Sequence, residues 1–507
     1  MIRLGGALSV ADVVTVARRG TPVGLDPEVA VRLERGRHAL DRLDRAGQVV
    51  YGVTTGVGKL KDTPIPPEAR RALQRNLVLS HAAGVGEPLE AAETRAVLVL
   101  LAASLARGHS GVRPVVVEQL VGCLNHGIMP IVPSRGSVGA SGDLAPLAHV
   151  AAFLIGEGDA MANGTRGPAR EALATAGLEP LVLEMKEGLA LLNGTHVMAA
   201  LAALLIHDVT ALVRVSDVAG AMSLEALMGT HVAFDARIHA LRPHPGQLDS
   251  AANLRALTEE SGIIASHRDC GRVQDPYSLR CMPQVHGAAR EALRLAREIV
   301  DRELGSVTDN PLVFPDDDAV LSGGNFHGQP LALALDVLAI GLAQLAGISE
   351  RRVDRLVNPL TNEGLPPFLA TPGGLHSGYM IAQYTAAALV AECRVLAHPA
   401  SVDSIPTSGL QEDWNSMGAT AALKARQILR LAQQVLGIEL VLAAQALDLR
   451  RPLESGRGTR AALAAVRARV PRLDGDRPVH PDLSTGVELV RDGSVVAAVE
   501  AVLGSLR

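Results

Sequence analysis

LKARQILRLAQQVLGIELVLAAQAL, residues 423–447, is the stretch that decides the fold. Its apolar residues are mostly leucine and alanine, which favour helices, and they fall on two sides of a helix rather than one. A helix that is apolar on more than one side is buried on more than one side. The stretch therefore predicts a long central helix in a bundle that is shared between subunits.

Three intervals without proline predict further long helices. They cover residues 181–242, 331–358 and 407–451, and the last of them contains the quoted stretch. Proline is poorly tolerated inside a helix, so its absence over such lengths permits long, unbroken helices. Alanine and leucine, which are strong helix formers, fill these intervals.

Shorter signals predict other elements. Ser9 and Asp12 have the spacing of a capping box at the start of a first helix. Residues 289–304 place apolar side chains three and four positions apart, which predicts an amphipathic helix. Clear strands are few, and residues 127–134 and 311–314 are the candidates for short extended pieces.

Loops are marked by clusters of glycine and proline, and in a helical scaffold loops carry function. These clusters lie at residues 51–67, 127–146, 305–330 and 363–378. The long helices and the scarcity of strands predict an all-α fold, and because no repeat or linker divides the chain we predict a single unit of residues 1–507. Within it, residues from about 1 to 195 form an N-terminal portion, and residues from about 196 to 507 form long central helices and a C-terminal helical portion.

The composition excludes several classes of protein. Aromatic residues make up only 2% of the chain, although 48% of its residues are hydrophobic. A single-strand-binding protein needs aromatic side chains on which bases stack, and a formal net charge of -5 offers no positive field for phosphates. We therefore expect no nucleic-acid partner, and the aliphatic content also excludes a disordered chain.

Compartment and membrane contact follow from cysteine usage and from uncharged stretches. The four cysteines are Cys123, Cys270, Cys281 and Cys393. Their wide spacing predicts reduced thiols in a cytoplasm, and the N-terminus lacks the long apolar core of a signal peptide. Residues 188–207 and 364–391 contain no Lys, Arg, Asp or Glu, and we expect both to be buried helices rather than membrane spans.

No metal or nucleotide site is predicted. The sixteen histidines include no HExxH pattern and no pair with good geometry for shared ligation. The spacing from Gly52 to Gly58 is one residue too long for a phosphate loop, and Leu60 stands where Ser or Thr is required. No G-x-G-x-x-G opens a strand-helix unit, so we expect no dinucleotide.

GSVGASGDLAPLAH, residues 136–149, contains a tripeptide that can build an electrophile from the chain itself. Gly142 has no β-carbon, so its amide nitrogen can approach the carbonyl carbon of Ala140 in a sharp bend. Ring closure between these atoms, with loss of one water from the ring and one from the Ser141 side chain, gives 4-methylideneimidazol-5-one (MIO). An isolated Ala-Ser-Gly is usually a plain turn, but here the whole flanking string points to the chemistry.

The string around this tripeptide resembles the aromatic amino acid ammonia-lyase family, most closely its histidine ammonia-lyases. Seven further blocks match the family and follow in its order. They are YGVTTGVGKL (51–60), NLVLSHAAGVG (76–86), KEGLALLNGT (186–195), VQDPYSLRC (273–281), VTDNPLVF (307–314), SGGNFHGQP (322–330) and SVDSIPTSGLQED (401–413). The blocks together are highly specific.

The resemblance implies an elimination of ammonia from an α-amino acid. The electrophile formed from Ala140, Ser141 and Gly142 would bond to the substrate and activate it. The family further implies a long-helix bundle whose N-terminal portion carries the MIO loop. It also implies a homotetramer whose active sites combine loops from more than one subunit.

The resemblance also implies roles for residues in the matching blocks. Tyr51 stands where the family places a catalytic tyrosine, and a phenol needs local help to act as a base. Arg280 would bind the substrate carboxylate, because its planar fork suits two oxygens. Tyr277 and Gln274 would support that region and the electrophile.

Four more residues complete the expected site. Asn193 would lie near the electrophile and the carboxylate, and Phe326 would form a wall of the site. His81 and Glu412 would hydrogen-bond the two imidazole nitrogens of a substrate histidine, and Glu412 could assist proton transfer. A carboxylate facing a phenyl ring would be desolvated without compensation, so Glu412 favours imidazole over phenyl.

The segment after Glu412 departs from the histidine-lyase pattern. Family members continue with His-Val-Ser, whereas this chain has Trp414, Asn415 and Ser416, and TSGL at 407–410 replaces the usual TSAN. These changes bear on the substrate and leave the chemistry of the electrophile unaffected.

Three functions remain open from the sequence. The first is conversion of L-histidine to trans-urocanate and ammonia by a carbon–nitrogen lyase. The second is a lyase or 2,3-aminomutase acting on tyrosine, phenylalanine or a modified histidine. The third, a catalytically silent helical scaffold, is disfavoured by the intact tripeptide together with Tyr51 and Arg280.

Overall fold

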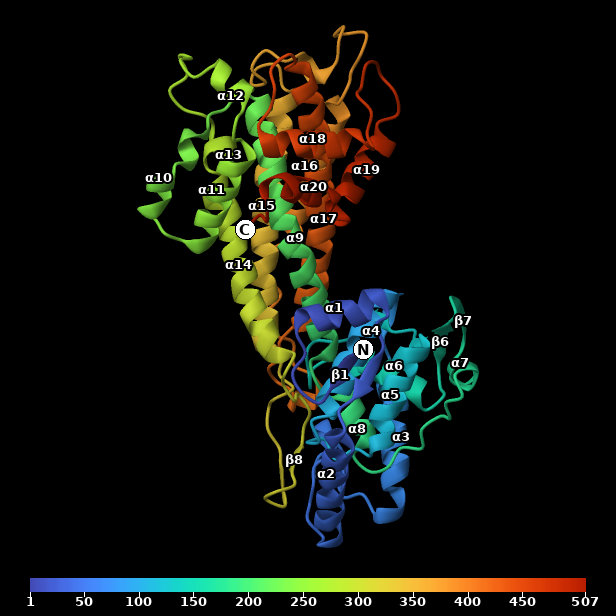
Figure 1. Cartoon of the computed structure of the whole chain (residues 1–507). Coiled ribbons are helices and arrows are strands. Elements are labelled where there is room, and N and C mark those ends of the chain that lie inside the picture. The colour runs from blue at the N-terminus through green and yellow to red at the C-terminus, as the bar shows by residue number, and fades with distance from the viewer. The chain divides into compact units, whose positions relative to one another are not determined.

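Helices dominate the computed structural model, which describes all 507 residues. Its twenty α-helices and nine short strands confirm the prediction of an all-α fold (Figure 1). The chain divides into two compact units. Unit 1 comprises Met1–His207, Arg297–Leu335 and Ala400–Leu423, and unit 2 comprises Asp208–Ala296, Asp336–Pro399 and Lys424–Arg507.

Four long helices contribute residues to both units. They are α9 (His196–Ala226), α14 (Met282–Glu303), α15 (Gln329–Val357) and α17 (Gly418–Leu449). Helices α9 and α17 lie inside proline-free intervals, and α15 fills the remaining interval to Val357 after starting two residues before it, which confirms that prediction. Helix α14 contains the predicted amphipathic helix up to Glu303. Within 423–447 only Gln427 is exposed, so the two-sided apolar pattern indeed marks a helix buried on nearly every side.

Unit 1 combines eight complete α-helices with all of the strands. The helices are α1 (Val10–Arg19), α2 (Glu28–Arg45), α3 (Arg70–His81), α4 (Ala91–Leu105), α5 (Pro114–His126), α6 (Leu144–Leu154), α7 (Ala169–Thr175) and α8 (Glu187–Leu192), with 3-10 turns η1 (Gly58–Leu60), η2 (Pro67–Ala69) and η5 (Ser408–Leu410). The N-cap prediction is confirmed: the Ser9 hydroxyl accepts a hydrogen bond from the Asp12 amide at 3.2 Å, and the Asp12 carboxylate accepts one from the Ser9 amide at 2.9 Å.

The strands of unit 1 are two to four residues long. They are β1 (Ile2–Leu4), β2 (Val23–Leu25), β3 (Val85–Pro88), β4 (Met129–Pro130), β5 (Pro133–Arg135), β6 (Asp159–Ala162), β7 (Thr165–Pro168), β8 (Leu312–Phe314) and β9 (Ala319–Leu321). They form a parallel pair β1-β2, antiparallel pairs β3-β5 and β8-β9, and a three-stranded sheet β4-β6-β7. Both predicted extended pieces are present, and the other short strands carried too little pattern to predict.

Unit 2 contains the other helices around its parts of the four long ones. They are α10 (Ala236–Ala240), α11 (Pro245–Leu257), α12 (Gly262–Ser266), α13 (Tyr277–Arg280), α16 (Met380–Leu396), α18 (Arg457–Arg467), α19 (His480–Arg491) and α20 (Ser494–Leu503), with 3-10 turns η3 (His231–Phe234) and η4 (Pro367–Leu369). Here α9, α14, α15 and α17 run side by side, and buried hydrogen bonds join their side chains (Figure 1).

The uncharged stretches behave differently from one another. In the first stretch, which covers α8 and the start of α9, residues 188–206 are buried as predicted and His207 is exposed. The prediction for residues 364–391 is wrong, because prolines and glycines hold 364–379 outside any α-helix and α16, which follows, buries only Ala382, Ala386 and Cys393. By length and composition alone α9, α15 and α17 could each cross a membrane, and 78%, 61% and 83% of their most apolar windows are buried inside the protein.

Candidate active site

The tripeptide that can form the electrophile is held in a tight bend between β5 and α6. Ser141 has φ 49° and Gly142 has φ 81°, both in the left-handed region that costs a residue with a side chain. Gly139 and Gly142 form an isolated antiparallel bridge across the bend. A Cβ added to Gly142 would lie 2.1 Å from the carbonyl oxygen of Gly194, so only glycine fits there. The backbone is therefore tightly bent at this tripeptide.

The loop before α9 is hydrogen-bonded to the loop that contains the tripeptide. The amide of Gly194 donates to the carbonyl oxygen of Ser141 at 3.1 Å, and the amide of Asp143 donates to the carbonyl oxygen of Gly194 at 2.9 Å. Gly142 and Gly194 also form a parallel bridge. The NGT segment, through Gly194, is thus in direct contact with the loop that carries the tripeptide.

Asp143 fixes the other side of this loop, and sequence reasoning missed it. Its fully buried carboxylate accepts hydrogen bonds from the amides of Val197 at 3.0 Å and Met198 at 2.9 Å, in the first turn of α9, and from the Ser137 hydroxyl at 3.1 Å. Burial raises the pKa of Asp143 to about 6, although these hydrogen bonds oppose the shift. The available signal was that Asp143 is the only acidic or basic residue in 136–149, histidine aside.

Tyr51 lies in a turn that presents an amide to its phenol. The Tyr51 hydroxyl oxygen accepts a hydrogen bond from the Gly58 amide at 2.8 Å. Burial raises the pKa of Tyr51, the Gly58 amide lowers it, and the nearby Glu412 carboxylate raises it further. The structure therefore brings Tyr51 and Glu412 together, although they are far apart in the chain.

Glu412 is held by its own loop. The Thr407 hydroxyl donates to Glu412 Oε2 at 2.7 Å, and the Thr407 amide donates to the Glu412 carbonyl oxygen at 2.9 Å. The same loop reaches the Tyr51 turn, because the Ser408 hydroxyl accepts a hydrogen bond from the Lys59 amide at 3.2 Å. Only one carboxylate oxygen is engaged by Thr407, which leaves the other available.

A buried glutamine ties the Tyr51 turn to α8. Gln74 Nε2 donates to the Gly52 carbonyl oxygen at 3.1 Å, and Gln74 Oε1 accepts from the Leu189 amide at 3.0 Å. A Cβ added to Gly52 would lie 2.3 Å from Leu189 Cδ2, so the turn packs directly on α8. Gln74 is a positioning residue that the sequence did not reveal, because its partners lie in distant segments.

Asn193 follows α8 and is anchored by a second buried group. Its Nδ2 donates to Asp309 Oδ1 at 3.2 Å and to the Asn310 carbonyl oxygen at 2.6 Å. Asp309 also pairs with the buried Lys186, with Nζ and Oδ2 2.6 Å apart. Burial lowers the pKa of Lys186 and the Asp309 carboxylate opposes this. The side-chain nitrogen of Asn193 thus donates its hydrogen bonds to the 307–314 loop.

His81 ends α3 with one ring nitrogen engaged. Its Nδ1 lies 2.8 Å from the carbonyl oxygen of Leu77. A carbonyl oxygen only accepts, so Nδ1 carries the hydrogen and Nε2 of a neutral ring is left as an acceptor. The half-buried ring therefore offers an acceptor to a ligand.

The residues that depart from the histidine-lyase pattern shape the loops. Asn415 Nδ2 donates to the Ile405 carbonyl oxygen at 2.7 Å and to Thr407 Oγ1 at 3.2 Å, so it supports the loop of Glu412. The Trp414 carbonyl oxygen lies 3.1 Å from His327 Nε2, while its indole is 62% exposed. Phe326, next to His327, is half-buried in the loop before α15.

Ser416 packs against the electrophile loop. Its Oγ lies 2.0 Å from the position that a Cβ on Gly139 would occupy, and the Met417 amide donates to the Val138 carbonyl oxygen at 3.0 Å. Asn415 thus stabilises the loop of Glu412, and Ser416 packs against the loop of the tripeptide, in addition to any effect of these residues on substrate choice.

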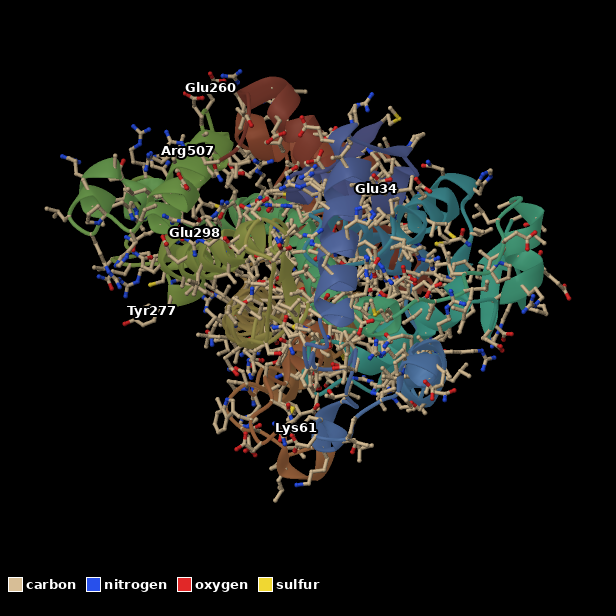
Figure 2. All side chains as sticks on the ribbon, turned by 90° about the horizontal axis from the view of Figure 1, so that it is seen from below. Glu34, Lys61, Glu260, Tyr277, Glu298 and Arg507 are labelled. Carbon is tan, nitrogen blue, oxygen red and sulfur yellow. The ribbon has the colours of Figure 1, made fainter.

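The other three predicted residues belong to unit 2. Gln274 is exposed, and the Tyr277 ring is 70% exposed and projects outward from the ribbon in Figure 2. The Arg280 guanidinium carbon lies 4.6 Å from the centre of the Tyr277 ring, and Arg280 Nε has no hydrogen-bond partner. The structure therefore brings Tyr277 and Arg280 together, with the arginine free of ion pairs.

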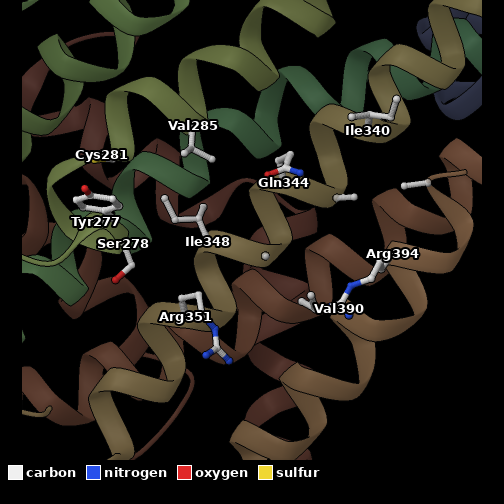
Figure 3. Close-up of a pocket in the computed structure, with 13 residues that line it drawn as sticks. Tyr277, Ser278, Cys281, Val285, Ile340, Gln344, Ile348, Arg351, Val390 and Arg394 are labelled. Atoms are coloured by element: carbon white, nitrogen blue, oxygen red, sulfur yellow. The ribbon is translucent and has the colours of Figure 1, made fainter.

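A cavity of about 520 Å³ in unit 2 begins at this turn. Tyr277 and Ser278 line one end of it, and Ile340 and Arg394 line the opposite end, as Figure 3 shows. Its walls are mostly aliphatic side chains of α14, α15 and α16. Of the predicted site residues, only Tyr277 contributes to this cavity.

The predicted residues are therefore divided between the units. Unit 1 contains Tyr51, His81, Ala140, Ser141, Gly142, Asn193, Phe326 and Glu412, and unit 2 contains Gln274, Tyr277 and Arg280. Direct contacts join the tripeptide to the segment that follows Asn193, and the Lys59–Ser408 hydrogen bond joins the loops of Tyr51 and Glu412.

Known proteins resemble the chain over its whole length. The family model described as aromatic amino acid lyase matches residues 8–468. A histidine ammonia-lyase of Symbiobacterium thermophilum is 55% identical, covering 100% of this chain and 99% of the relative. The crystal structure of histidine ammonia-lyase from Trypanosoma cruzi is 41% identical with a TM-score of 0.91, covering 99% of this chain and 95% of that one. Tyrosine aminomutase from Streptomyces globisporus is 38% identical with a TM-score of 0.94, and the match covers 100% of both chains.

Proposed function

The chain belongs to the aromatic amino acid lyase family, and from that premise we propose that this carbon–nitrogen lyase converts L-histidine to trans-urocanate and ammonia. The observation that carries the substrate is Glu412, held by Thr407 and close to Tyr51. Full-length similarity to proteins named histidine ammonia-lyase supports the same substrate.

Ala140, Ser141 and Gly142 are the proposed source of the MIO group. The residues present fit it, because the tripeptide is already bent and the contact with Gly194 leaves no room for a β-carbon on Gly142. Once formed, the group supplies an electrophilic carbon that activates the amino acid for loss of ammonia. The roles of the surrounding side chains follow from their own geometry.

Tyr51 is the proposed base that removes the β-proton. The Gly58 amide points at its oxygen and stabilises the phenolate, whereas burial and Glu412 favour the neutral phenol. The pKa of Tyr51 is raised, so only a small fraction is ionised at neutral pH. The Glu412 carboxylate interacts electrostatically with Tyr51, and we propose that it assists the proton transfer.

His81 and Glu412 are proposed to recognise the imidazole ring. His81 Nε2 and the free oxygen of Glu412 both accept hydrogen bonds. A protonated imidazole presents an N–H to each of them, whereas a phenyl ring presents none. A bound phenyl ring would cover both half-buried acceptors without offering a donor, so the pair selects against phenylalanine.

The other site residues are proposed to bind the substrate carboxylate or to form the walls of the site. We propose that Arg280 holds the substrate carboxylate, with its guanidinium stacked on Tyr277 and no competing ion pair. Asn193, Gln274 and Tyr277 support this end of the substrate and the electrophile, and Phe326 forms a wall. The family implies a homotetramer with shared active sites, and cysteine usage predicts a cytoplasmic location; we extend both features to this chain as proposals.

A second function has its own support. The full-length likeness to tyrosine aminomutase from Streptomyces globisporus, together with Trp414 and Asn415 next to Glu412, favours a lyase or 2,3-aminomutase acting on another aromatic amino acid. The same residues would serve both outcomes, because an aminomutase returns the ammonia to the β-carbon.

A substrate panel decides between these functions. Purified protein is offered histidine, tyrosine, phenylalanine and their β-isomers, and urocanate formation is followed by its absorbance. Histidine should be turned over, and Glu412→Gln should lower its kcat/KM about 10- to 100-fold, the value of a hydrogen bond to a charged group. Asp413→Asn is the matched control, since Asp413 is exposed. Turnover of tyrosine without histidine would overturn the histidine assignment.

A further inference from the structure

Unit 2 contains a buried charge network that the proposed reaction does not use. Arg352 of α15 and Glu439 of α17 are fully inaccessible, and two hydrogen bonds join them, from Nε to Oε1 at 2.5 Å and from Nη2 to Oε2 at 2.8 Å. The hydroxyls of Ser223 and Ser349 donate to the same carboxylate at 2.7 and 2.6 Å. Both oxygens of Glu439 are therefore fully satisfied.

A second buried carboxylate lies in the same network. Asp217 of α9 accepts hydrogen bonds from Ser250 Oγ at 2.6 Å, Asn253 Nδ2 at 2.9 Å and Arg290 Nη2 at 2.6 Å. Burial alone would raise the pKa of Asp217, but Arg290 and hydrogen bonds from His286 and Ser250 lower it to about 2. Asp217 is thus charged, and its charge is balanced by Arg290.

His286 of α14 joins the two carboxylate centres. Its Nδ1 lies 2.8 Å from Asp217 Oδ1 and its Nε2 lies 3.4 Å from Arg352 Nη1. The charged carboxylate accepts, so Nδ1 carries the hydrogen and Nε2 accepts from Arg352. Burial lowers the pKa of His286, which agrees with a neutral ring. The hydrogen bonds therefore run in one direction, from Arg352 through His286 to Asp217.

One hydrogen bond joins this network to residues 273–281, the segment that contains Arg280. Arg352 Nη1 also donates to the carbonyl oxygen of Ser278 at 3.4 Å. Ser278 lies in α13, a helix of four residues that begins with Tyr277 and ends with Arg280. No other side chain of the network described above bonds to residues 273–281.

The side chain of Arg280 has little else to hold it. Its guanidinium stacks on the ring of Tyr277, which is itself 70% exposed, and its Nε has no hydrogen-bond partner. Of the four residues of α13, only Leu279 is buried. The direction of the Arg280 fork therefore depends on how the main chain of α13 is held.

We propose that Arg352 is a positioning residue for substrate binding. It holds the Ser278 carbonyl against the charged core and so fixes the turn from which Arg280 meets the substrate carboxylate. The inference rests on the proposed role of Arg280. It predicts that Arg352 matters for ligands that carry a carboxylate and much less for ligands that lack one.

The test compares two arginine-to-lysine variants of the same network. Arg352→Lys keeps the charge beside Glu439 but loses the donors that reach Ser278 and His286. Arg290→Lys makes the same chemical change beside Asp217, without a bond to residues 273–281. The KM and kcat for L-histidine are measured, together with the inhibition constant of histamine, which keeps the imidazole and the amine but lacks the carboxylate.

The expected result is a selective loss. Arg352→Lys should raise the KM for histidine about fivefold to tenfold, the value of about one hydrogen bond, while the histamine inhibition constant changes less than about twofold. Arg290→Lys should change neither. Equal weakening of both ligands, an equal effect of Arg290→Lys, or an unchanged KM in Arg352→Lys would each overturn the proposal.

Two further measurements keep the result interpretable. The intact mass of each variant reports whether two waters have been lost from the tripeptide, so a defect in the electrophile is recognised. If Arg352→Lys does not fold, the double variant R352Q/E439Q removes both charges together and should show the same selectivity.

Failure of the proposed function is distinguishable. It appears as wild-type protein that does not convert histidine. The amino acid that it does convert, and the amine lacking its carboxylate, then take the places of histidine and histamine in the same comparison.

Discussion

Unit 1 and unit 2 each bury an aspartate, and they stabilise it in different ways. Asp143 in unit 1 has only main-chain amides and a serine as partners, and burial raises its pKa to about 6. Asp217 in unit 2 is equally buried, but the charge of Arg290 and its hydrogen bonds lower its pKa to about 2. Dipoles at a helix start offset only part of the cost of burying a carboxylate, whereas a full cation reverses it.

The two units also bury a histidine in different ways. Neither ring nitrogen of His196 has a hydrogen-bond partner, and burial lowers its pKa to about 4. His286 instead lies between Asp217 and Arg352. Asp143 and His196 in unit 1 are therefore buried without a charged partner, whereas Asp217 and His286 in unit 2 are buried among paired charges.

The largest effect is expected where the electrophile loop is closest to another backbone. In Gly142→Ala the new methyl group would meet the Gly194 carbonyl oxygen at 2.1 Å, which is backbone and cannot move aside. The tripeptide should fail to lose two waters, and turnover should fall by about a thousandfold or more, or ~4 kcal/mol. Intact mass and initial rates measure both.

The matched control for that prediction is Gly167→Ala. Gly167 has no atom within 4 Å of an added Cβ, so its activity should be that of the unchanged chain. A fully active Gly142→Ala variant with normal mass loss would show that the close contact with Gly194 is unimportant.

The next effect concerns Tyr51. Since burial raises its pKa, the ionised base becomes more abundant as pH rises, and kcat/KM should increase from pH 7 to pH 9. Tyr51→Phe should lose about 10²- to 10⁴-fold in kcat/KM, and the pH dependence should disappear with it. A Tyr51→Phe profile that keeps the full slope would assign the titration, and the base, to another group.

Replacing each of the two buried aspartates by asparagine should change the free energy of unfolding by different amounts. Asp217→Asn leaves Arg290 buried without its anionic partner and should cost about 3–5 kcal/mol in unfolding free energy at pH 7. Asp143→Asn loses hydrogen bonds but leaves no buried cation without a partner, so the expected loss of unfolding free energy is about 1–2 kcal/mol. Urea unfolding of the whole protein measures both, and equal costs would contradict the distinction drawn between the two carboxylates.

The pH dependence of these variants has opposite signs. Asp217 has a lowered pKa in the folded state, so its contribution is present above pH 4 and is lost as pH falls toward 2. Asp143 has a raised pKa, so the folded state binds its proton more tightly. The advantage of wild-type protein over Asp143→Asn should therefore grow as pH falls from 7 to about 4.

The smallest effect is expected at the histidines. His286→Leu leaves Asp217 without one hydrogen bond and Arg352 without an acceptor, and should cost about 1–3 kcal/mol. His196→Leu removes a ring whose nitrogens have no partners, so its stability should change by less than about 1 kcal/mol. Thermal midpoints compare the two, and a larger loss in His196→Leu would show that this ring has a partner in solution.

Local pattern predicted the long helices well. Proline-free intervals rich in leucine and alanine became α9, α15 and α17, because helix propensity and periodicity act within a few turns. The pattern failed for 364–391, where an uncharged composition suggested a buried helix although prolines and glycines exclude one over 364–379. Hydrophobicity alone does not decide whether a segment is buried or helical.

The motifs of the sequence predicted the residues of the candidate site, but not the residues that hold them in place. The tripeptide, Tyr51 and Glu412 were recognisable in their blocks, and the loops of Tyr51 and Glu412 proved to be in contact. Gln74 and Lys186 were not, because each meets its partner more than 100 residues away, Leu189 at a separation of 115 and Asp309 at 123. A single sequence carries no periodic signal for such a pairing.

By itself the sequence determined which segments form helices, where loops interrupt them, and that Ala140, Ser141 and Gly142 have the atoms from which an electrophile can form. These properties depend on covalent chemistry and on neighbours within a few residues. Only the tertiary structure decided that Asp143 binds the start of α9 and that Arg352 joins Glu439 to the Ser278 carbonyl. Burial and charge pairing arise when distant segments meet, and they set the pKa values and orientations on which the chemistry depends.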